Sequence, residues 1–404
     1  MNVDTIYLQE YEVKEVEGLT SSQIQLLRNN FAKYVSLQPS WQDNKHLLRA
    51  KHYVGTIVLD DRRIIIKPKV PASNLFYMLT YAYDLVNFRQ EISQLEVGDD
   101  LFEFVVIIFL QQVEQLIRQG IQQGYVKQET NQNFLRGRLL LAPHLQKNVV
   151  KVHHFYQRFS QFTVDIDENR ILKYTLERLL KLDYRQVDLR LHIRRVLSAF
   201  SGVSWQPITP YDCEQVQYTR LNRRYQTAIQ LSRLLIQNLS LESGEGQISA
   251  AAYLFDMNKL FEQFIGSFLA EYFTKYPAWS VTLQEEIWLD SQGGEKGYPD
   301  IVLRYRNQPH IILDVKYKKF KKRPERNDLN QMFVYCHTLN VHHGIFVYAN
   351  SSVEVYQSRL HKAYIQALFL PLEGRLEQFQ QRCYQFAEQF RERALSTITD
   401  GEDG

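Results

Sequence analysis

The sequence predicts a mixed α/β protein with a small N-terminal mixed domain, a helical arm and a C-terminal α/β domain. Three observations predict this class: strand-like patterns near the start, long helical periodicity with few glycines in the middle, and an α-β-β-β-α-β order after about residue 248. The length of 404 residues also favours two or three domains over one core. We place the domains at 1–73, 74–247 and 248–394, followed by a frayed acidic tail at 395–404.

Composition and charge exclude several classes of protein. A hydrophobic content of 45% with 23% charged residues is typical of a folded globular chain. The 48 basic and 45 acidic residues give a net charge of +3, so any nucleic-acid surface must be local. The three cysteines lie far apart without a C-x-x-C pair, which argues against a disulfide framework or a cysteine zinc site. The start lacks a signal-peptide pattern, and the longest apolar run, Val105–Leu110, is too short to span a membrane. We therefore expect a cytoplasmic protein with no membrane partner.

The N-terminal domain is expected to mix strands with one helix. Its pattern begins with a strand-like alternation and continues with a helix over about Ser22–Val35. Strands follow at His52–Leu59 and Arg63–Lys69, joined by a turn at Asp60–Asp61. Pro68 and Pro71 then break the regular pattern and predict a domain boundary.

The middle of the chain is expected to be mostly helical. A helix should start with Asn74 as its N-cap and carry one apolar face from Leu75 to Val86. One strand-like interruption occurs near Phe134–Leu141, and the apolar-free segment Glu242–Gln247 predicts a linker. Further helical patterns cover Leu101–Ile117, Asn169–Leu182, Leu189–Phe200 and Leu221–Leu239.

The C-terminal domain is expected to alternate helices with strands. Helices are predicted at about Met257–Tyr276 and Asp328–Leu339. The predicted strands are Ser280–Leu289, Pro299–Arg306, His310–Lys318 and Gly344–Ala349.

Asp314 is the most unusual residue of this domain. It follows Ile311–Leu313 and precedes Val315, so a carboxylate stands in an expected buried strand, which costs free energy unless it is paired or binds a cation. Residues i and i+2 of a strand share a face, so Lys316 projects beside Asp314, and the hairpin brings Asp300 within reach. Two carboxylates and an ammonium are therefore expected to converge.

This group of residues suits metal-dependent phosphodiester chemistry. Oxygen ligands without His or Cys favour Mg²⁺ or Mn²⁺, and such an ion can activate a water molecule. The expected metal-binding residues are Asp300, Asp314 and Val315. Lys316 can hold the attacking water or screen negative charge, and Glu262 on the preceding helix can add a further carboxylate, so the expected catalytic set is Asp300, Asp314, Lys316 and Glu262.

The spacing of these residues carries more weight than the tripeptide. Acid-x-Lys also occurs at Glu12–Lys14 and Asp43–Lys45, where nothing else supports a site. Pro299-Asp300, thirteen further residues and then Asp314–Lys316 on consecutive expected strands match the PD-(D/E)xK nuclease pattern. An ion pair at a strand end is the alternative and stays open.

Residues around this motif predict DNA contacts. Gln331 and Tyr335 on the next helix resemble the nucleic-acid-positioning pair of RecB-like nucleases, although Gln380 and Tyr384 repeat the spacing. Seven of the eleven residues from Lys316 to Arg326 are basic. Beside a phosphodiesterase site, such a run suits a phosphate backbone, whereas an isolated run is usually a solvated face. The expected DNA contacts in this run are Lys318, Lys319, Lys321, Lys322 and Arg323.

Other residue patterns argue against further sites. The adjacent pairs His153–His154 and His342–His343 do not have the i, i+4 spacing of a chelating pair. The chain contains no G-x-x-x-x-G-K-[ST] motif, so we expect it to bind no nucleotide itself and to need no cofactor besides the metal.

The chain resembles McrC, the nuclease subunit of McrBC-type modification-dependent restriction systems. Asn74–Tyr83 is similar to the family's tyrosine-rich segment, Leu135–Leu139 to its G-R-[IL] element, and Asp167–Lys173 to its E-N-R-x-x-K helix. These segments and the nuclease motif occur in family order up to about residue 350. Residues 1–73 resemble the extra N-terminal domain of longer members, with Ile64–Val70 similar to its strand end.

The resemblance implies a Mg²⁺-dependent DNA endonuclease for phage defence. It implies that Asp300 and Asp314 bind the metal, that Lys316 completes the catalytic set, and that the arm docks onto a hexameric AAA+ GTPase, McrB, and stimulates it. Arg136 and Arg138 are candidates for that stimulation, while 5-methylcytosine is read by the partner in this family. Two alternatives stay open: a non-catalytic GTPase-activating assembly subunit, and a free-standing RecB-like repair exonuclease.

Overall fold

The chain forms two compact units. The computed structural model describes residues 4–41, 45–59, 62–85, 101–182, 184, 186–244, 247–290, 294–350, 356–360 and 363–399. The first unit combines residues 1–101 with 240–404, and the second, here called the arm unit, comprises residues 102–239. Within the described ranges, no helix has both the length and the apolar character needed to cross a membrane.

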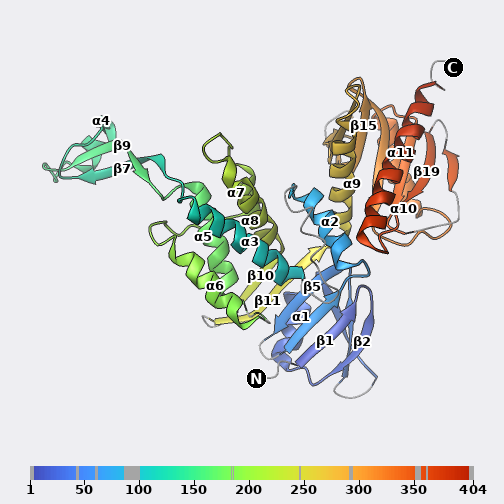
Figure 1. Cartoon of the computed structure of the whole chain (residues 1–404), viewed down its shortest axis with the longest axis horizontal. Helices are drawn as coiled ribbons and strands as arrows, with labels where there is room; N and C mark the ends of the chain where they lie inside the picture. The colour runs from blue at the N-terminus through green and yellow to red at the C-terminus, as the bar shows by residue number, and fades with distance from the viewer. Residues whose placement is uncertain are drawn as a thin grey trace. The chain divides into compact units, whose positions relative to one another are not determined.

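A five-stranded sheet joins the two chain segments of the first unit (Figure 1). Its strand order is β1 (Asp4–Gln9), β6 (Arg62–Lys67), β5 (Tyr53–Leu59), β11 (Gln247–Asp256) and β10 (Leu239–Gly244). β1 and β6 are parallel, whereas β5 pairs antiparallel with both β6 and β11. The expected linker at Glu242–Gln247 is wrong for 242–244, which end β10, and for Gln247, which begins β11; residues 245 and 246 lie outside the described residues. The polar composition of that segment fits the end of a hairpin strand as well as a linker.

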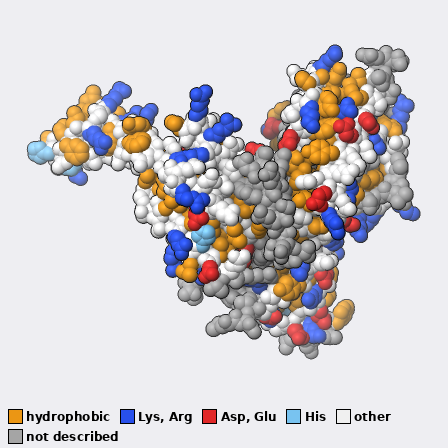
Figure 2. Space-filling view, viewed as in Figure 1, with side chains coloured by type: hydrophobic (Ala, Val, Ile, Leu, Met, Phe, Trp, Pro, Cys, Tyr) orange, Lys and Arg blue, Asp and Glu red, His pale blue; other side chains and the backbone are white. Residues whose placement is uncertain are grey.

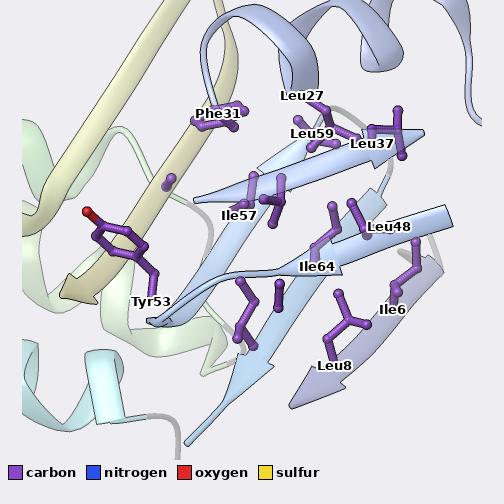
Figure 3. Packing of buried hydrophobic residues seen from close by; sticks show 14 of the residues in the cluster. Ile6, Leu8, Leu27, Phe31, Leu37, Leu48, Tyr53, Ile57, Leu59 and Ile64 are labelled. Atoms are coloured by element: carbon purple, nitrogen blue, oxygen red, sulfur yellow. The ribbon is translucent and has the colours of Figure 1, made fainter. Parts of the chain in front are cut away.

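A second, three-stranded sheet completes the N-terminal region. It has the order β2 (Val13–Glu17), β4 (Lys45–Ala50), β3 (Val35–Pro39). Helix α1 (Ser21–Asn29) packs with these strands around a buried cluster that includes Leu27, Leu48 and Ile57 (Figure 3). The predicted helix was too long at its end, because Val35 is a strand residue opposite Ala50. The predicted turn at Asp60–Asp61 lies outside the described residues.

A six-stranded mixed sheet forms the C-terminal part of the first unit. The strand order is β12 (Trp279–Leu283), β15 (Ile301–Tyr305), β16 (Gln308–Lys316), β17 (His343–Tyr348), β19 (Ala363–Phe369) and β18 (Gln357–Leu360). β12, β15 and β16 run antiparallel, and β16, β17 and β19 run parallel. A two-stranded ribbon of β13 (Ile287–Trp288) and β14 (Lys296–Gly297) lies outside this sheet. The predicted strand Ser280–Leu289 is therefore divided, because Gln284 takes a left-handed φ of 48° directly after β12.

Four helices accompany this sheet: α2 (Ala72–Ala82), α9 (Met257–Phe273), α10 (Arg326–Thr338) and α11 (Leu376–Thr399). α2 starts after Pro71, so Asn74 is not the N-cap; it is buried and its amide donates to the carbonyls of Leu372 and Gly374. Val86 of the predicted apolar face lies outside the described residues. The frayed tail predicted at 395–404 is wrong for residues 395–399, because they continue α11. The Thr397 hydroxyl there is hydrogen-bonded to the His310 ring.

The arm unit contains helices and a small sheet. Its helices are α3 (Leu101–Arg118), α4 (Leu141–Lys147), α5 (Asp167–Leu180), α6 (Val187–Ser198), α7 (Pro210–Glu214), the short η3 (Arg223–Tyr225) and α8 (Gln226–Asn238). Strands β7 (Gly124–Gln132), β9 (Phe155–Thr163) and β8 (Arg138–Leu139) form an antiparallel sheet. The predicted mostly helical middle thus missed β7 and β9, whose polar, exposed residues hide the usual apolar alternation of a strand.

Candidate active site

Strand β16 carries the central residues of the candidate site. Asp314 and Lys316 lie on the same face as Ile312, which packs with Met332 of α10. Strand β15 begins at Ile301, opposite Leu313, so Asp300 stands where the neighbouring strand starts. The antiparallel hairpin thereby brings together residues fourteen positions apart in the sequence.

Direct contacts link the predicted residues. Asp300 Oδ2 accepts a 2.7 Å hydrogen bond from the backbone N–H of Val315. Lys316 Nζ lies 2.7 Å from Asp314 Oδ2. Glu262, on α9, accepts a hydrogen bond from the Gln284 amide, which also reaches Asp300 Oδ1 at 3.5 Å. The structure therefore brings all four predicted catalytic residues into one neighbourhood.

The electrostatics of the three carboxyl groups are unusual. Burial raises the pKa of Asp314, opposed by Lys316 and reinforced by Asp300. Burial and the charge of Glu262 raise the pKa of Asp300, and burial likewise raises the pKa of Glu262. The pKa of Lys316 is also raised, because nearby Asp314 outweighs the effect of burial. Clustered carboxyl groups with raised pKa values are typical of catalytic and cation-binding sites.

Oxygen donors in this cluster fit a hard divalent cation. Asp314 Oδ2 is a buried atom that accepts no well-aligned hydrogen bond, despite its ion pair with Lys316. The Lys316 ammonium compensates this buried carboxylate in part, and a bound divalent cation would compensate it further. Among the residues that the structure describes, however, no three His, Cys, Asp or Glu side chains stand close enough to form a ready ligand set. Asp300, Asp314 and Val315 would be the residues to hold the ion, and its remaining ligands would be water, as Mg²⁺ prefers.

Two polar residues of the site were not predicted. Gln284 bridges Glu262 and Asp300, and Asp328 at the start of α10 lies 3.7 Å from Lys316 and 2.8 Å from Lys318. Asp328 was expected only as the start of a helix. The one available signal was an acidic residue near a helix start directly after a basic run, and Gln284 had none because it stood inside a predicted strand.

Gln331 and Tyr335 form a linked pair. The Gln331 amide donates to the Tyr335 hydroxyl at 2.9 Å, and that hydroxyl accepts the backbone N–H of Tyr298 at 3.3 Å. Tyr335 is buried in the core beside α10, whereas Gln331 is exposed. Tyr335 therefore supports the segment that leads into Asp300, and only Gln331 is free to meet a ligand.

Most of the basic run faces solvent. Lys319, Lys321, Lys322 and Arg323 are exposed. Lys318 differs, because its ammonium pairs with Glu325 at 3.0 Å and with Asp328 at 2.8 Å. The exposed cations remain suited to a phosphate backbone, while Lys318 is held within the protein.

The motifs of the arm unit that resemble McrC make structural contacts. Asn169 donates to the carbonyls of Gln122 and Val164, and Lys173 donates to the carbonyl of Val203. Gly137 has a φ of +79°, and an added Cβ would lie 2.5 Å from the Arg158 carbonyl oxygen. The E-N-R-x-x-K and G-R-[IL] elements thus hold the arm unit together.

Apolar side chains gather on the surface of β7, β8, α4 and β9, here called the arm tip, residues 124–163 (Figure 2). Arg136 stacks on Phe159 at 4.4 Å within it, and Arg138 lies opposite Arg158. The exposed apolar residues are Tyr125, Phe134, Leu135, Leu141, Leu145, Val149, Val150, Val152 and Phe162. So many exposed apolar side chains in one region indicate an interaction surface.

Comparison with known proteins places the chain in a family. The solved assembly of Thermococcus gammatolerans McrB AAA+ hexamers with bound McrC contains a chain of similar fold, with a TM-score of 0.59 and 21% identity over 98% of this chain and 100% of that one. The type IV methyl-directed restriction enzyme EcoKMcrBC of Escherichia coli strain K12 is 24% identical over 268 residues, 63% of this chain and 75% of that protein. The sequence model of the McrBC 5-methylcytosine restriction system component matches residues 48–349. The chain therefore belongs to the family of McrBC 5-methylcytosine restriction system components, as its resemblance to McrC predicted.

Proposed function

We propose that this chain is the McrC-type endonuclease subunit of a modification-dependent restriction complex and cleaves DNA with Mg²⁺. The observation that carries the proposal is the cluster of Asp300, Asp314 and Glu262 around the half-buried Lys316, in which contacts link the four residues and burial raises the pKa of each carboxyl group. A protein that only clamped DNA would gain nothing from burying these acids. Membership in a restriction-system family supports DNA as the substrate.

Each residue of the site has a distinct role in this proposal. Asp300 and Asp314, with Val315, would hold the ion, which when bound supplies Lewis-acid stabilisation of the scissile phosphate. Lys316 orients the attacking water and balances negative charge that develops on the phosphate. Gln284 fixes Glu262 against Asp300, and Asp328 restrains the ammonium of Lys316. The exposed lysines and arginine after β16 bind the DNA backbone without reading its sequence.

We further propose that the arm tip docks onto a hexameric McrB-type AAA+ GTPase. A relative of similar fold is part of a solved assembly of McrB hexamers with bound McrC. Apolar residues exposed by 54% to 88%, among them Phe134 and Val150, would be buried by that partner. Arg136 and Arg138 lie in the same tip and are the candidates for stimulating the partner's GTPase.

The decisive experiment combines the chain with its AAA+ partner, GTP, Mg²⁺ and methylated or unmethylated plasmid. Asp314→Ala and the more conservative Asp314→Asn should lower cleavage by about 100- to 1000-fold. Folding and partner assembly should persist, because burial already disfavours the charged form of Asp314, as its raised pKa shows, and Lys316 keeps Asp328 as a partner at 3.7 Å. Asp290→Ala is the matched control, since Asp290 is an exposed carboxylate of the same unit that accepts the Gly294 N–H.

The outcomes separate the candidate functions. Unchanged cleavage by both Asp314 variants would contradict the proposed site. If the wild type does not cut but stimulates the partner's GTPase, the chain is an assembly subunit. Degradation of DNA ends without partner or GTP would favour a free-standing exonuclease.

A further inference from the structure

Strand β16 does not end in solvent after Lys316. The next residue, Tyr317, is 9% exposed, and its hydroxyl donates to both carboxylate oxygens of Glu10, at 3.1 and 2.9 Å. Glu10 is 2% exposed and follows β1 of the N-terminal sheet. A residue near the start of the chain thus contacts the residue adjacent to the candidate catalytic lysine.

Glu10 is itself fixed by the backbone around it. Its N–H donates to the Lys67 carbonyl at 3.2 Å, and its Oε1 accepts the Lys69 N–H at 3.4 Å. Tyr11 beside it takes a left-handed φ of 63°. A non-glycine residue in that region is held there by its surroundings, so the turn presents Glu10 in a defined position.

Tyr317 connects Glu10 to both sides of the candidate site. Along the chain it follows Lys316, and across the fold its ring lies 6.0 Å from the ring of Phe261 on α9. Phe261 directly precedes Glu262. Displacement of the Tyr317 side chain would therefore shift Lys316 and relax the helix position that carries Glu262.

Burying the Glu10 carboxylate beside the Tyr317 hydroxyl costs free energy. Burial raises the pKa of Glu10 to about 7, opposed by the hydrogen bond from Tyr317. A buried acid of this kind favours one fixed geometry, because any other leaves it without its donors.

We propose that Glu10 is a positioning residue that holds Tyr317, and through it Lys316 and Glu262, in the geometry required for cleavage. The N-terminal region, residues 4–67, is then part of the nuclease machinery rather than an independent accessory domain. This inference rests on the proposed function for its catalytic consequence, whereas the positioning itself can be measured separately.

The test compares Glu10→Ala, Tyr317→Phe and Glu10→Gln in the complete complex. Glu10→Ala and Tyr317→Phe should lower kcat for cleavage about 10-fold at unchanged KM for DNA, because small displacements of catalytic groups slow the chemical step. Glu10→Gln should stay near the wild-type rate, since its amide oxygen still accepts the Tyr317 hydroxyl. In the double variant Glu10→Gln with Tyr317→Phe, residue 10 carries no charge that could lack the Tyr317 hydroxyl as its donor. Its kcat should equal that of Tyr317→Phe alone.

Hydrogen exchange of residues 308–318 supplies a readout independent of activity. Exchange should rise in Glu10→Ala and Tyr317→Phe and stay unchanged in Glu10→Gln. Glu12→Ala is the matched control, because Glu12 is an exposed acid of the same turn that accepts the Gln9 N–H at 2.6 Å.

Two results would overturn the inference. One is wild-type kcat in both Glu10→Ala and Tyr317→Phe, even with faster exchange, which makes the pair merely structural. The other is unchanged exchange in both variants. A wild-type complex that does not cut DNA contradicts the proposed function instead, and the exchange result then decides the positioning by itself.

Discussion

Asp165 of the arm unit and the carboxyl groups of the candidate site have pKa values shifted in opposite directions. In the arm unit, Asp165 is bound by the Arg170 guanidinium at 2.8 and 3.0 Å and by Ser204, and these hydrogen bonds hold its pKa at about 2. In the candidate site, burial raises the pKa values of Asp300 and Asp314. Asp165 is paired in a way that stabilises the fold, whereas the carboxyl groups of the candidate site are only partly compensated, which fits our proposal of a cation-binding site.

The exposure of apolar side chains also differs between the clusters of the first unit and the arm tip. The N-terminal cluster and the sheet around α10 bury their apolar residues within the first unit. The arm tip instead exposes Val150 by 88% and Leu145 by 68%. This difference supports our proposals that cleavage takes place in the first unit and that the arm tip binds the partner.

The largest expected effect tests how tightly each unit is packed. Gly55 of β5 has a φ of +139°, and an added Cβ would lie 2.0 Å from the Tyr253 carbonyl oxygen of β11. Gly55→Ala should lower the free energy of unfolding of the first unit by about 3 kcal/mol, because the clash is with backbone. Urea unfolding followed by hydrogen exchange in β5 and β11 measures this loss.

Gly120→Ala is the matched variant in the arm unit. Gly120 has a φ of +87° after α3, but its Cβ would meet no atom within 4 Å. The cost should be about 1 kcal/mol, from the left-handed backbone alone. Equal losses at the two glycines would contradict the close pairing of β5 with β11.

The second effect concerns the stability contributed by Asp165, which is lost at low pH. Asp165→Asn should destabilise the arm unit by about 2 kcal/mol at pH 7, because charge-assisted hydrogen bonds to Arg170 are lost. The folded pKa of Asp165 is below its unfolded value, so this stability is present above about pH 4 and is lost as the pH falls toward 2.

Hydrogen exchange of residues 164–173 at pH 7 and pH 3 measures this difference. The difference in exchange rate between the wild type and Asp165→Asn should be smaller at pH 3 than at pH 7. Asp167→Asn is the control, because Asp167 is 81% exposed and contacts Arg170 through one oxygen. A gap that is the same at both pH values would show that the Arg170 pairing does not stabilise the fold.

Local sequence patterns predicted many elements of both units. Helices α3, α5, α6, α9 and α10 and strands β5, β6, β15, β16 and β17 lie close to their predicted ranges, because apolar periodicity sets them. The convergence of Asp300, Asp314 and Lys316 followed from the hairpin of β15 and β16.

Long-range contacts could not be predicted in the same way. The pairing of β11 with β5 joins segments about two hundred residues apart, and nothing local in Ala250–Asp256 identifies that partner. The same limit applies to Gln284, Asp328 and Glu10, whose roles depend on which side chain the fold places opposite them. Asn74 has the residue type of an N-cap, but its amide is used by the 372–374 loop instead.

The smallest effect on stability is expected at the arm tip, where a substitution should weaken partner binding instead. Val150→Ser should change the free energy of unfolding by less than about 0.5 kcal/mol, because the side chain is already in water. The same substitution at buried Val347 of β17 should cost about 3 kcal/mol, since it leaves a cavity and a buried hydroxyl.

If the tip is the docking surface, Val150→Ser should also weaken binding to the AAA+ partner about 5-fold while cleavage at saturating partner is retained. Titration of partner GTPase activity measures that affinity, and an unchanged titration curve for Val150→Ser and Leu145→Ser together would move the docking surface away from the arm tip.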